Sequence, residues 1–336
     1  MDAQQMAPDA VGIVVIGRNE GDRLVACLAS LQGLGRPIVY VDSGSVDSSV
    51  QRARPLVTEV VELDPQRPFS AARARNEGFA RLLARHPVTA FVQFLDGDCT
   101  LLAGWLDAAV RAIREDPKRA VVVGPLQERR PDASIYNRLC ALEWRSPAGE
   151  ISNFGALGGI MLVRASAFSQ LGGFNEQVIA GEDSEFGVRA SSVGFRIVKI
   201  DVPMATHDAE IYRFGQWWKR AVRSGHAIGQ RFSLNGSGPT HDCARERRSV
   251  LVWGCALPLA IVVLAPFTKG LSGLLAVGYL VLGQRIVRYR RMQGDRPDDA
   301  RLYASFVVLG KFAEALGLLR FHLNRIAGHY RIIEYK

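Results

Sequence analysis

From Val11 to about Ile200, short apolar runs of strand length alternate with segments whose apolar residues recur at helical spacing. The runs are rich in β-branched and aromatic residues, as strands are. This alternation predicts an α/β domain with a mostly parallel sheet covered on both faces, in which ligands bind outside the carboxyl ends of the strands. The predicted strands are Val11–Ile16, Ile38–Val41, Ala90–Leu95 and Ala120–Val123, and the predicted helices are Leu24–Leu31, Ala71–Leu83, Trp105–Ile113 and Tyr212–Phe232.

The pattern changes after Arg248. Val250–Phe267 carries no charge and is long enough to cross a membrane, whereas Leu271–Gly283 is apolar but shorter. We expect a hydrophobic hairpin over about 250–287, with a hairpin buried in a soluble protein as the alternative. Tyr303–Phe321 contains Lys311 and Glu314, so an interfacial amphipathic helix is expected over about 302–321. The predicted domains are residues 1–240 and a membrane-associated region, residues 241–336.

The net charge of +9 indicates anionic partners, and the placement of arginines selects among them. Arginine clusters flank the apolar runs, which is typical of a membrane surface, and no nucleic-acid-binding motif is present. We therefore expect membrane lipids and no nucleic acid as partners. Such clusters prefer the cytoplasmic side of a membrane, and a hairpin places both arginine clusters on that side. The clusters are Arg245, Arg247, Arg248 and Arg285, Arg288, Arg290, Arg291.

Two further features bear on the compartment. The five cysteines are scattered, with no CxxC spacing, which argues against a disulfide framework or a zinc site and favours a reducing compartment. Residues 1–10 lack the basic and then apolar pattern of a signal peptide. The sequence therefore predicts a protein of the cytoplasmic (inner) membrane whose catalytic domain faces the cytoplasm.

The strongest chemical signal follows the predicted strand Ala90–Leu95. Asp96 and Asp98 come next, separated only by Gly97, which gives the backbone freedom to turn both carboxylates toward one ion. Mg²⁺ and Mn²⁺ prefer oxygen ligands and bind through one or two carboxylates together with substrate phosphates. A plain Asp-Gly turn after a strand is the alternative.

Two other polar clusters lie near predicted strand ends. Asp42 and Ser43 follow the second strand, where a carboxylate can accept a hydrogen bond from a pyrimidine base, and Asp47 is positioned to cap the next helix. Arg75 lies early in a predicted helix, where a guanidinium can clamp a diphosphate, although a solvated helix face explains it equally well.

Taken in order, these and further motifs resemble glycosyltransferase family 2, the large inverting family with the GT-A fold. The resemblance covers about Val11 to Arg231. The motifs that carry it are Val15-Ile16-Gly17-Arg18-Asn19-Glu20, Asp42-Ser43-Gly44-Ser45-Val46-Asp47, Ala74-Arg75-Asn76-Glu77-Gly78, Asp96-Gly97-Asp98, Gly158-Gly159-Ile160-Met161-Leu162-Val163-Arg164, Gly172-Gly173-Phe174-Asn175-Glu176 and Gly181-Glu182-Asp183-Ser184-Glu185-Phe186.

The resemblance implies roles for individual residues. Asp98 ligates a divalent metal that bridges the donor diphosphate, with Asp96 beside the ribose and close to the same metal. Asp183, in the Glu182-Asp183 pair, is the general base for the acceptor hydroxyl. The acidity of a helix N-terminus also accounts for that pair. The nucleotide-sugar site is expected to include Ile16, Glu20, Asp42, Ser43, Arg75, Asp96 and Gly159.

The C-terminal part of the resemblance departs from the family pattern. Many members carry a Gln-x-x-Arg-Trp motif, but here the stretch reads Gln216-Trp217-Trp218-Lys219-Arg220, which favours single-sugar transfer over polymer synthesis. We assign Trp218 and Arg220 to the donor site, with packing of Trp218 against the protein or the membrane interface as the alternative. His207 resembles a further metal ligand of related enzymes, although a lone histidine is more often structural.

The resemblance thus predicts a metal-dependent inverting glycosyltransferase that uses Mg²⁺ or Mn²⁺. It would move one sugar from a nucleotide-sugar, UDP- or GDP-linked, to a lipid-linked or envelope polysaccharide acceptor. Two alternatives stay open: a catalytically silent membrane subunit that binds nucleotide-sugar or lipid, and a sugar-phosphate nucleotidyltransferase. The nucleotidyltransferase would normally show a Gly-rich basic loop after the first strand, which Gly17-Arg18-Asn19-Glu20 is not.

Overall fold

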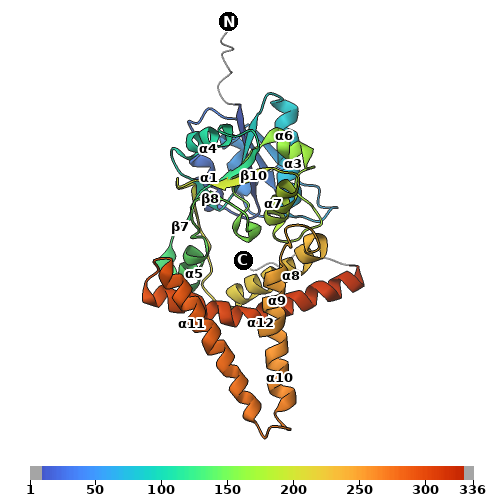
Figure 1. Cartoon of the computed structure of the whole chain (residues 1–336). Helices are drawn as coiled ribbons and strands as arrows, with labels where there is room; N and C mark the ends of the chain where they lie inside the picture. Colours follow the sequence, from blue (N-terminus) through green and yellow to red (C-terminus); the bar gives the residue numbers. More distant parts are fainter. Residues whose placement is uncertain (1–9, 329–336) are drawn as a thin grey trace. The chain divides into compact units, whose positions relative to one another are not determined.

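The structure is a computed structural model that describes residues 10–328 of the 336-residue chain. It divides into two compact units (Figure 1). The first unit comprises Met1–Arg129 and Trp144–Ala209, and the second comprises Arg130–Glu143 and Glu210–Lys336. Each unit has its own architecture, and each is described by itself below.

The first unit is built on an eight-stranded sheet with the strand order β3-β2-β1-β4-β9-β6-β10-β8. Its pairs are parallel except where β9 lies between β4 and β6 and where β8 adds to the edge of β10. The predicted mostly parallel α/β sheet is confirmed. The strands of this sheet are β1 (Val11–Gly17), β2 (Ile38–Asp42), β3 (Glu59–Glu62), β4 (Phe91–Asp96), β6 (Arg119–Val123), β8 (Gly149–Glu150), β9 (Met161–Arg164) and β10 (Arg196–Lys199).

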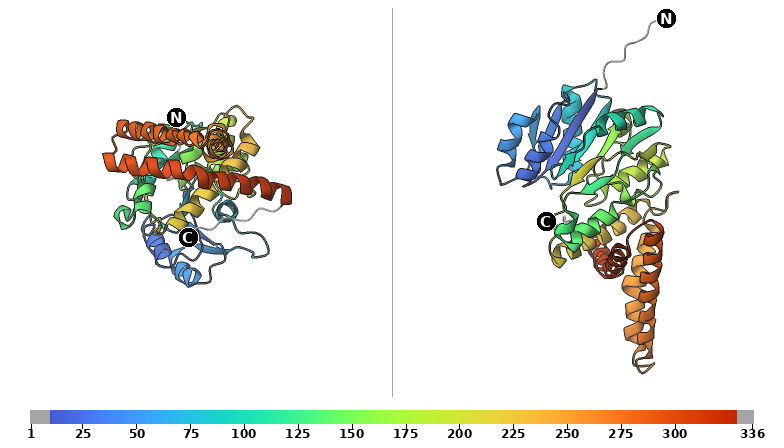
Figure 2. Two further views of the ribbon diagram at one scale, coloured as in Figure 1. Left: turned by 90° about the horizontal axis from the view of Figure 1, so that it is seen from below. Right: turned by 90° about the vertical axis from the view of Figure 1, so that its left-hand side faces the viewer.

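Helices cover both faces of this sheet, so the central strands are apolar on both sides. Val14 of β1 packs into a cluster with α3, α6 and α7, whereas Val15 packs into a second cluster with α1 and α4. This alternation follows from the two-residue period of a strand. The right-hand view of Figure 2 shows helices on the two sides of the sheet. The helices of this unit are α1 (Asp22–Ala29), α2 (Ser49–Ala53), η1 (Arg54–Leu56), α3 (Ala71–Arg85), α4 (Trp105–Arg114), η3 (Phe154–Ala156), α6 (Ala165–Gln170) and α7 (Glu182–Ser192).

The strand register brings the candidate acidic residues to one edge of the sheet. β1 pairs with both β2 and β4, so that Gly17 lies opposite Asp42 and Ile16 lies opposite Asp96. Because these three strands are parallel, their carboxyl ends meet at the same edge, where ligands of open α/β sheets bind.

A second, three-stranded sheet stands beside this edge. It contains β5 (Cys99–Leu101), β11 (Ala205–His207) and β7 (Leu126–Glu128), in the order β5-β11-β7. β11 runs antiparallel to β5, and His207 lies opposite Cys99. The pairing therefore carries a histidine from late in the unit to the Asp96-Gly97-Asp98 turn.

The second unit is helical. It comprises η2 (Pro131–Ala133), α5 (Ile135–Glu143), α8 (Phe214–Asn235), α9 (Ala244–Val250), η4 (Leu251–Ala256), α10 (Leu257–Leu264), η5 (Leu271–Ala276), α11 (Val277–Met292) and α12 (Pro297–Ala327). The helices α9, η4 and α10 continue one another as one arm of a hairpin, and η5 with α11 forms the other arm (Figure 1). α12 includes residues 302–321, and the predicted position of this helix at the membrane interface stays a prediction.

Leucine and valine side chains cover the outside of the hairpin and are exposed, including Leu259, Val262, Leu274 and Leu280. Three helical segments are long and apolar enough to cross a membrane: Ala244–Leu264, Leu271–Met292 and Pro297–Ala327. In the view from below (Figure 2, left), α10 is seen end-on and α12 lengthwise, so α12 crosses the direction of that arm. The composition of these segments fits membrane association.

Glycines allow α8 and α12 to approach each other at backbone distance. A Cβ on Gly225 of α8 would lie 2.0 Å from the carbonyl oxygen of Glu314, and a Cβ on Gly317 of α12 would lie 2.0 Å from the carbonyl oxygen of Val222. Backbone atoms cannot move aside as the end of a side chain can. The crossing therefore requires the absence of a side chain on both helices.

We predict that Gly225→Ala destabilises the protein by about 1–3 kcal/mol, because the added methyl group forces the two helices apart. Gly215→Ala, on the same helix, is the control, since nothing lies within 4 Å of a Cβ built there. Thermal unfolding of the detergent-solubilised full chain measures both. Equal unfolding temperatures for the two variants would show that the close crossing is not required.

Candidate active site

Arg75 on α3 links two acidic residues from distant parts of the chain. Its Nη2 donates to Asp96 Oδ1 at 2.7 Å and its Nη1 donates to Glu182 Oε1 at 2.6 Å. Asp96 ends β4, and Glu182 begins α7. Burial alone lowers the pKa of Arg75, but the carboxylates of Asp96, Glu182 and Asp183 outweigh it and raise the pKa above its ordinary value. The guanidinium, with a side chain only 3% exposed, therefore stays charged and joins the two elements.

The loop before β9 leaves room for this guanidinium. A Cβ on Gly159 would lie 2.0 Å from Arg75 Nη2, so only glycine fits without displacing the arginine. The Phe174 ring covers the guanidinium from another side, with 5.7 Å between Cζ and the ring centroid. Gly159, assigned from the sequence to the nucleotide-sugar site, thus borders Arg75. Donor contacts by Arg75 and Gly159 stay predictions, because both terminal nitrogens of Arg75 bond to protein carboxylates.

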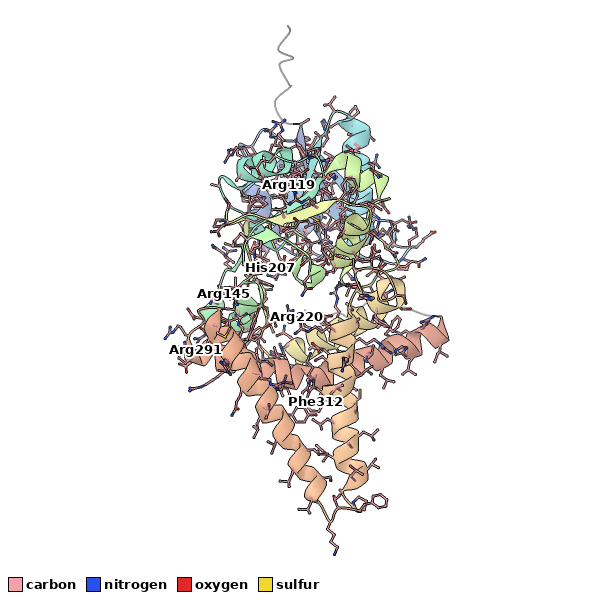
Figure 3. The ribbon with its side chains drawn as sticks, viewed as in Figure 1. Arg119, Arg145, His207, Arg220, Arg291 and Phe312 are labelled. Carbon is pink, nitrogen blue, oxygen red and sulfur yellow. The ribbon has the colours of Figure 1, made fainter. Side chains whose placement is uncertain are left out.

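Asp98, Cys99 and His207 form a group whose possible ligand atoms all lie within 4.8 Å of one another. Asp98 Oδ2 is 3.3 Å from His207 Nε2, and the Cys99 thiol donates to Asp98 Oδ1 at 3.4 Å. The Trp144 ring meets the imidazole edge to face, with 4.8 Å between ring centroids. Figure 3 labels His207. A carboxylate such as Asp98 suits Mg²⁺ or Mn²⁺, so this residue fits the predicted metal, and the His207 imidazole lies beside it.

Two buried thiols lie behind the acidic turn. Burial raises the pKa of Cys27 and of Cys99, and the nearby charges of Asp98 and Asp96 raise both further. The Cys27 thiol contacts the carbonyl oxygen of Asp96 at 3.6 Å. These side chains are therefore neutral, and they pack as small apolar groups with weak donors.

The loop after β2 is held by the Asp42 side chain. Ser45 donates from its backbone N to Oδ2 at 2.7 Å and from its hydroxyl to Oδ1 at 2.5 Å, and Tyr40 donates its hydroxyl to Oδ1 at 2.8 Å. Burial and the Asp42 charge raise the pKa of Tyr40, which stays a donor. The Ser43 backbone N donates to the carbonyl oxygen of Gly17 at 3.0 Å. Asp42 and Ser43 therefore lie on an ordered rim at the expected edge.

The loop after β1 is tied to the same rim. Asn19 donates from its backbone N to Ser45 Oγ and accepts from the backbone N of Val46, both at 2.8 Å. Asn19 has a positive φ of 56°, a conformation that asparagine tolerates better than most residues. The reciprocal bonds fix the β1 and β2 loops relative to each other.

Ile16 lies near the end of β1 and Glu20 lies in the loop that follows, and their contacts with a nucleotide stay predictions. The Ile16 carbonyl oxygen accepts from the backbone N of Gly97 at 2.8 Å, which ties β1 to the acidic turn. Glu20 forms an ion pair with Arg23 at 2.8 Å. A Cβ on Gly97 would lie 3.3 Å from Glu20 Cγ, so the Glu20 side chain passes beside this turn.

The N-terminus of α7 carries the candidate base. Gly181 precedes the helix in the left-handed region, with φ 78°, and Glu182 and Asp183 occupy its first turn. Glu182 is buried against Arg75, whereas Asp183 is half-buried. The partial positive charge of a helix N-terminus favours anionic side chains at this place.

Trp218 and Arg220 belong to the second unit, on α8. Arg220 (Figure 3) forms an ion pair with Glu143, with 2.7 Å between the nitrogen and the carboxylate oxygen. Trp218 packs beside Phe214 and Trp217, with ring centroids 5.7 Å and 6.2 Å apart. Their assignment to the donor site stays a prediction.

Several site residues escaped the sequence analysis. Tyr40 could have been found, since it lies two residues before Asp42 and the side chains of i and i+2 lie on the same face of a strand. Trp144 and the partnership of Glu182 with Arg75 gave no local signal. They depend on contacts between segments that are far apart in the chain.

Comparison with known proteins bears on the family and the fold. The sequence model described as Glycosyl transferase family 2 matches residues 12–171. The chain is similar to the pre-mycofactocin glycosyltransferase of Mycobacterium tuberculosis, with 30% identity over 209 residues that cover 59% of this chain and 42% of that protein. It thus spans less than half the length of that relative. Glycosyltransferase AglE of Haloferax volcanii is 24% identical over 229 residues, which cover 64% of this chain and 71% of AglE.

Among solved structures, the chain resembles the mannosyltransferase PcManGT from Pyrobaculum calidifontis, determined in complex with GDP-Man and Mn²⁺. The TM-score is 0.61 at 21% identity, over 94% of this chain and 90% of that chain. At this level of identity the likeness shows the fold, which is the GT-A fold. The chain therefore carries a domain of glycosyltransferase family 2 over residues 12–171, and it has the GT-A fold.

Proposed function

We propose that this protein is a metal-dependent inverting glycosyltransferase that moves one sugar from a UDP- or GDP-linked donor to a lipid-linked or envelope polysaccharide acceptor. One observation supports this proposal above all. Asp42, Asp96 and Asp98 lie at the carboxyl ends of adjacent parallel strands, and Arg75 joins the Asp96 carboxylate to the first turn of α7.

The donor would lie along this edge. Asp42 and Ser43, on the rim formed by the β1 and β2 loops, face the base end, and Asp96 lies toward the ribose. Asp98 and His207 would hold Mg²⁺ or Mn²⁺, which when bound neutralises charge on the diphosphate. We include Asp96 in the proposed metal site, although its Oδ1 already accepts from Arg75.

Asp183 would act on the acceptor. Its carboxylate removes the proton of the acceptor hydroxyl as the hydroxyl oxygen bonds to the anomeric carbon. The bond from that carbon to the diphosphate oxygen breaks, and the nucleoside diphosphate leaves with the electron pair. The reaction inverts the anomeric centre because the hydroxyl attacks opposite the leaving group. Glu182, held by Arg75, would orient the first turn of α7 and hence Asp183.

The helical unit supports the rest of the proposal. Its apolar hairpin is flanked by arginine clusters, which prefer the cytoplasmic side of a membrane. We therefore place the protein at the cytoplasmic membrane, with its catalytic domain facing the cytoplasm. An acceptor attached to lipid or to an envelope polysaccharide would be accessible there. The silent membrane subunit is the other outcome of the second test below.

The first test is a screen of nucleotide-sugars for thermal stabilisation of the full chain with Mn²⁺. At a donor concentration 100 times its Kd, we expect stabilisation of about 2.7 kcal/mol. The shift should disappear with chelator and in Asp98→Asn and His207→Ala, but persist in Asp107→Asn, an exposed acid on α4. If no nucleotide-sugar changes the melting temperature, the chain does not bind such a donor.

The second test concerns the base. We expect Asp183→Asn to keep the affinity for the donor and to lose transfer by roughly 10²–10⁴-fold, because an amide cannot take up the acceptor proton. Product formation and donor-induced stabilisation are measured on the same preparation, with Asp107→Asn as the control. Transfer at the wild-type rate would assign the base to another residue, and no transfer by the unaltered protein would favour the silent subunit.

The third test concerns Arg75. Arg75→Met leaves the buried Glu182 carboxylate and the partly exposed Asp96 carboxylate without their cation, so we expect a loss of about 3–5 kcal/mol in stability. Arg52→Met is the matched control, because Arg52 pairs with Asp22 at the same 2.7 Å but at the surface, where such pairs contribute about 0–1 kcal/mol. Thermal unfolding compares the two. Similar losses would mean that the buried bridge contributes no more than a surface pair.

A further inference from the structure

Four exposed arginines occur as two pairs at the open end of the hairpin. Arg245 and Arg248 lie on α9, and Arg285 and Arg288 lie on α11. In each pair the spacing of three residues brings both side chains to one face of the helix. None of the four forms an ion pair with another described residue, whereas Arg290 on α11 pairs with Asp295.

The two pairs lie at the same level along the hairpin. The arms are joined by a hydrogen bond from Ser272 Oγ to the carbonyl oxygen of Ile261 at 2.8 Å, and by one from Tyr279 Oη to that of Trp253 at 2.6 Å. Continuing this antiparallel register away from the tip brings Arg285 level with Arg248. Figure 3 labels Arg291, which lies farther along α11 toward the same open end.

Each pair begins one helical turn beyond the apolar surface of its arm. The first exposed aliphatic side chain after α9 is Val252, 43% exposed, and the run of exposed leucines and valines on α11 ends at Val281, 42% exposed. One further turn moves the chain about 6 Å along the helix axis. If the apolar surface marks the hydrocarbon layer, the guanidinium groups reach the layer of lipid headgroups.

We propose that these four arginines bind the phosphate headgroups of anionic phospholipids in the leaflet that the hairpin enters. The planar guanidinium donates two parallel hydrogen bonds to phosphate oxygens, and an anionic leaflet attracts such cations. Charge complementarity and direct continuity with the apolar hairpin select this partner. The inference rests on membrane association and is independent of the sugar-transfer reaction.

The test measures thermal unfolding of the full chain in a neutral detergent as lipid is added. Phosphatidylglycerol should raise the unfolding temperature and phosphatidylcholine should not, and raising the salt from 50 to 500 mM should reduce the effect because it screens exposed charges. In Arg245→Gln/Arg248→Gln and in Arg285→Gln/Arg288→Gln, the phosphatidylglycerol concentration needed for half of the shift should rise by roughly tenfold or more.

The control is Arg111→Gln/Lys118→Gln, which removes the same charge from exposed positions of the other unit and should respond as the unaltered protein does. Inorganic phosphate at equal concentration separates lipid from free anion. An equal response to inorganic phosphate, to phosphatidylcholine or in the arginine variants would overturn the proposal. Because no nucleotide-sugar is present, failure of this test leaves the proposed transfer reaction untouched, and the reverse also holds.

Discussion

The buried bridge of Arg75 connects the two sides of the candidate active site. One carboxylate that it binds ends β4, next to the turn that contains Asp98, and the other begins α7, next to Asp183. A buried arginine without carboxylates would carry a large desolvation cost. Without the arginine, the Asp96 and Glu182 carboxylates would lack a positive charge to balance them. The three groups therefore hold one another in place, and with them the metal-side turn and the helix that carries the proposed base.

The rest of the edge follows from the parallel register. Because β1 lies between β2 and β4, the loops after these strands are neighbours, and backbone bonds of Ser43, Asn19 and Gly97 join them. The Asp42 oxygens accept hydrogen bonds from Ser45 in its own loop and from Tyr40, so this side chain holds the rim in its conformation. An edge built in this way is ordered before any ligand arrives, which reduces the entropy lost on binding.

The helical unit solves a different problem. Its hairpin exposes leucine and valine side chains over its length, and such an apolar surface is more stable in hydrocarbon than in water. By contrast, α12 packs closely on α8 through Gly225 and Gly317. Lys311 and Glu314 of α12 pair with each other at 2.8 Å, so the two charges that suggested an interfacial helix neutralise one another locally. The crossing of α12 over the direction of α10 suits a helix at the membrane surface, although its length and composition also permit a span.

The sequence by itself predicted the strands β1, β2, β4 and β6, the helices α1, α3, α4 and α8 and the acidic loops, because the period of apolar residues and the chemistry of Asp-Gly turns are local properties. It also placed Asp42, Asp96 and Asp98 at strand ends and grouped Glu182 with Asp183. Only the tertiary structure decided what these residues touch. That Arg75 bonds to Asp96 and Glu182, that Gly159 makes room for it, and that Trp144 packs on His207 depend on strand order and helix packing. Those arise from contacts between residues far apart in the chain, for which no short pattern exists.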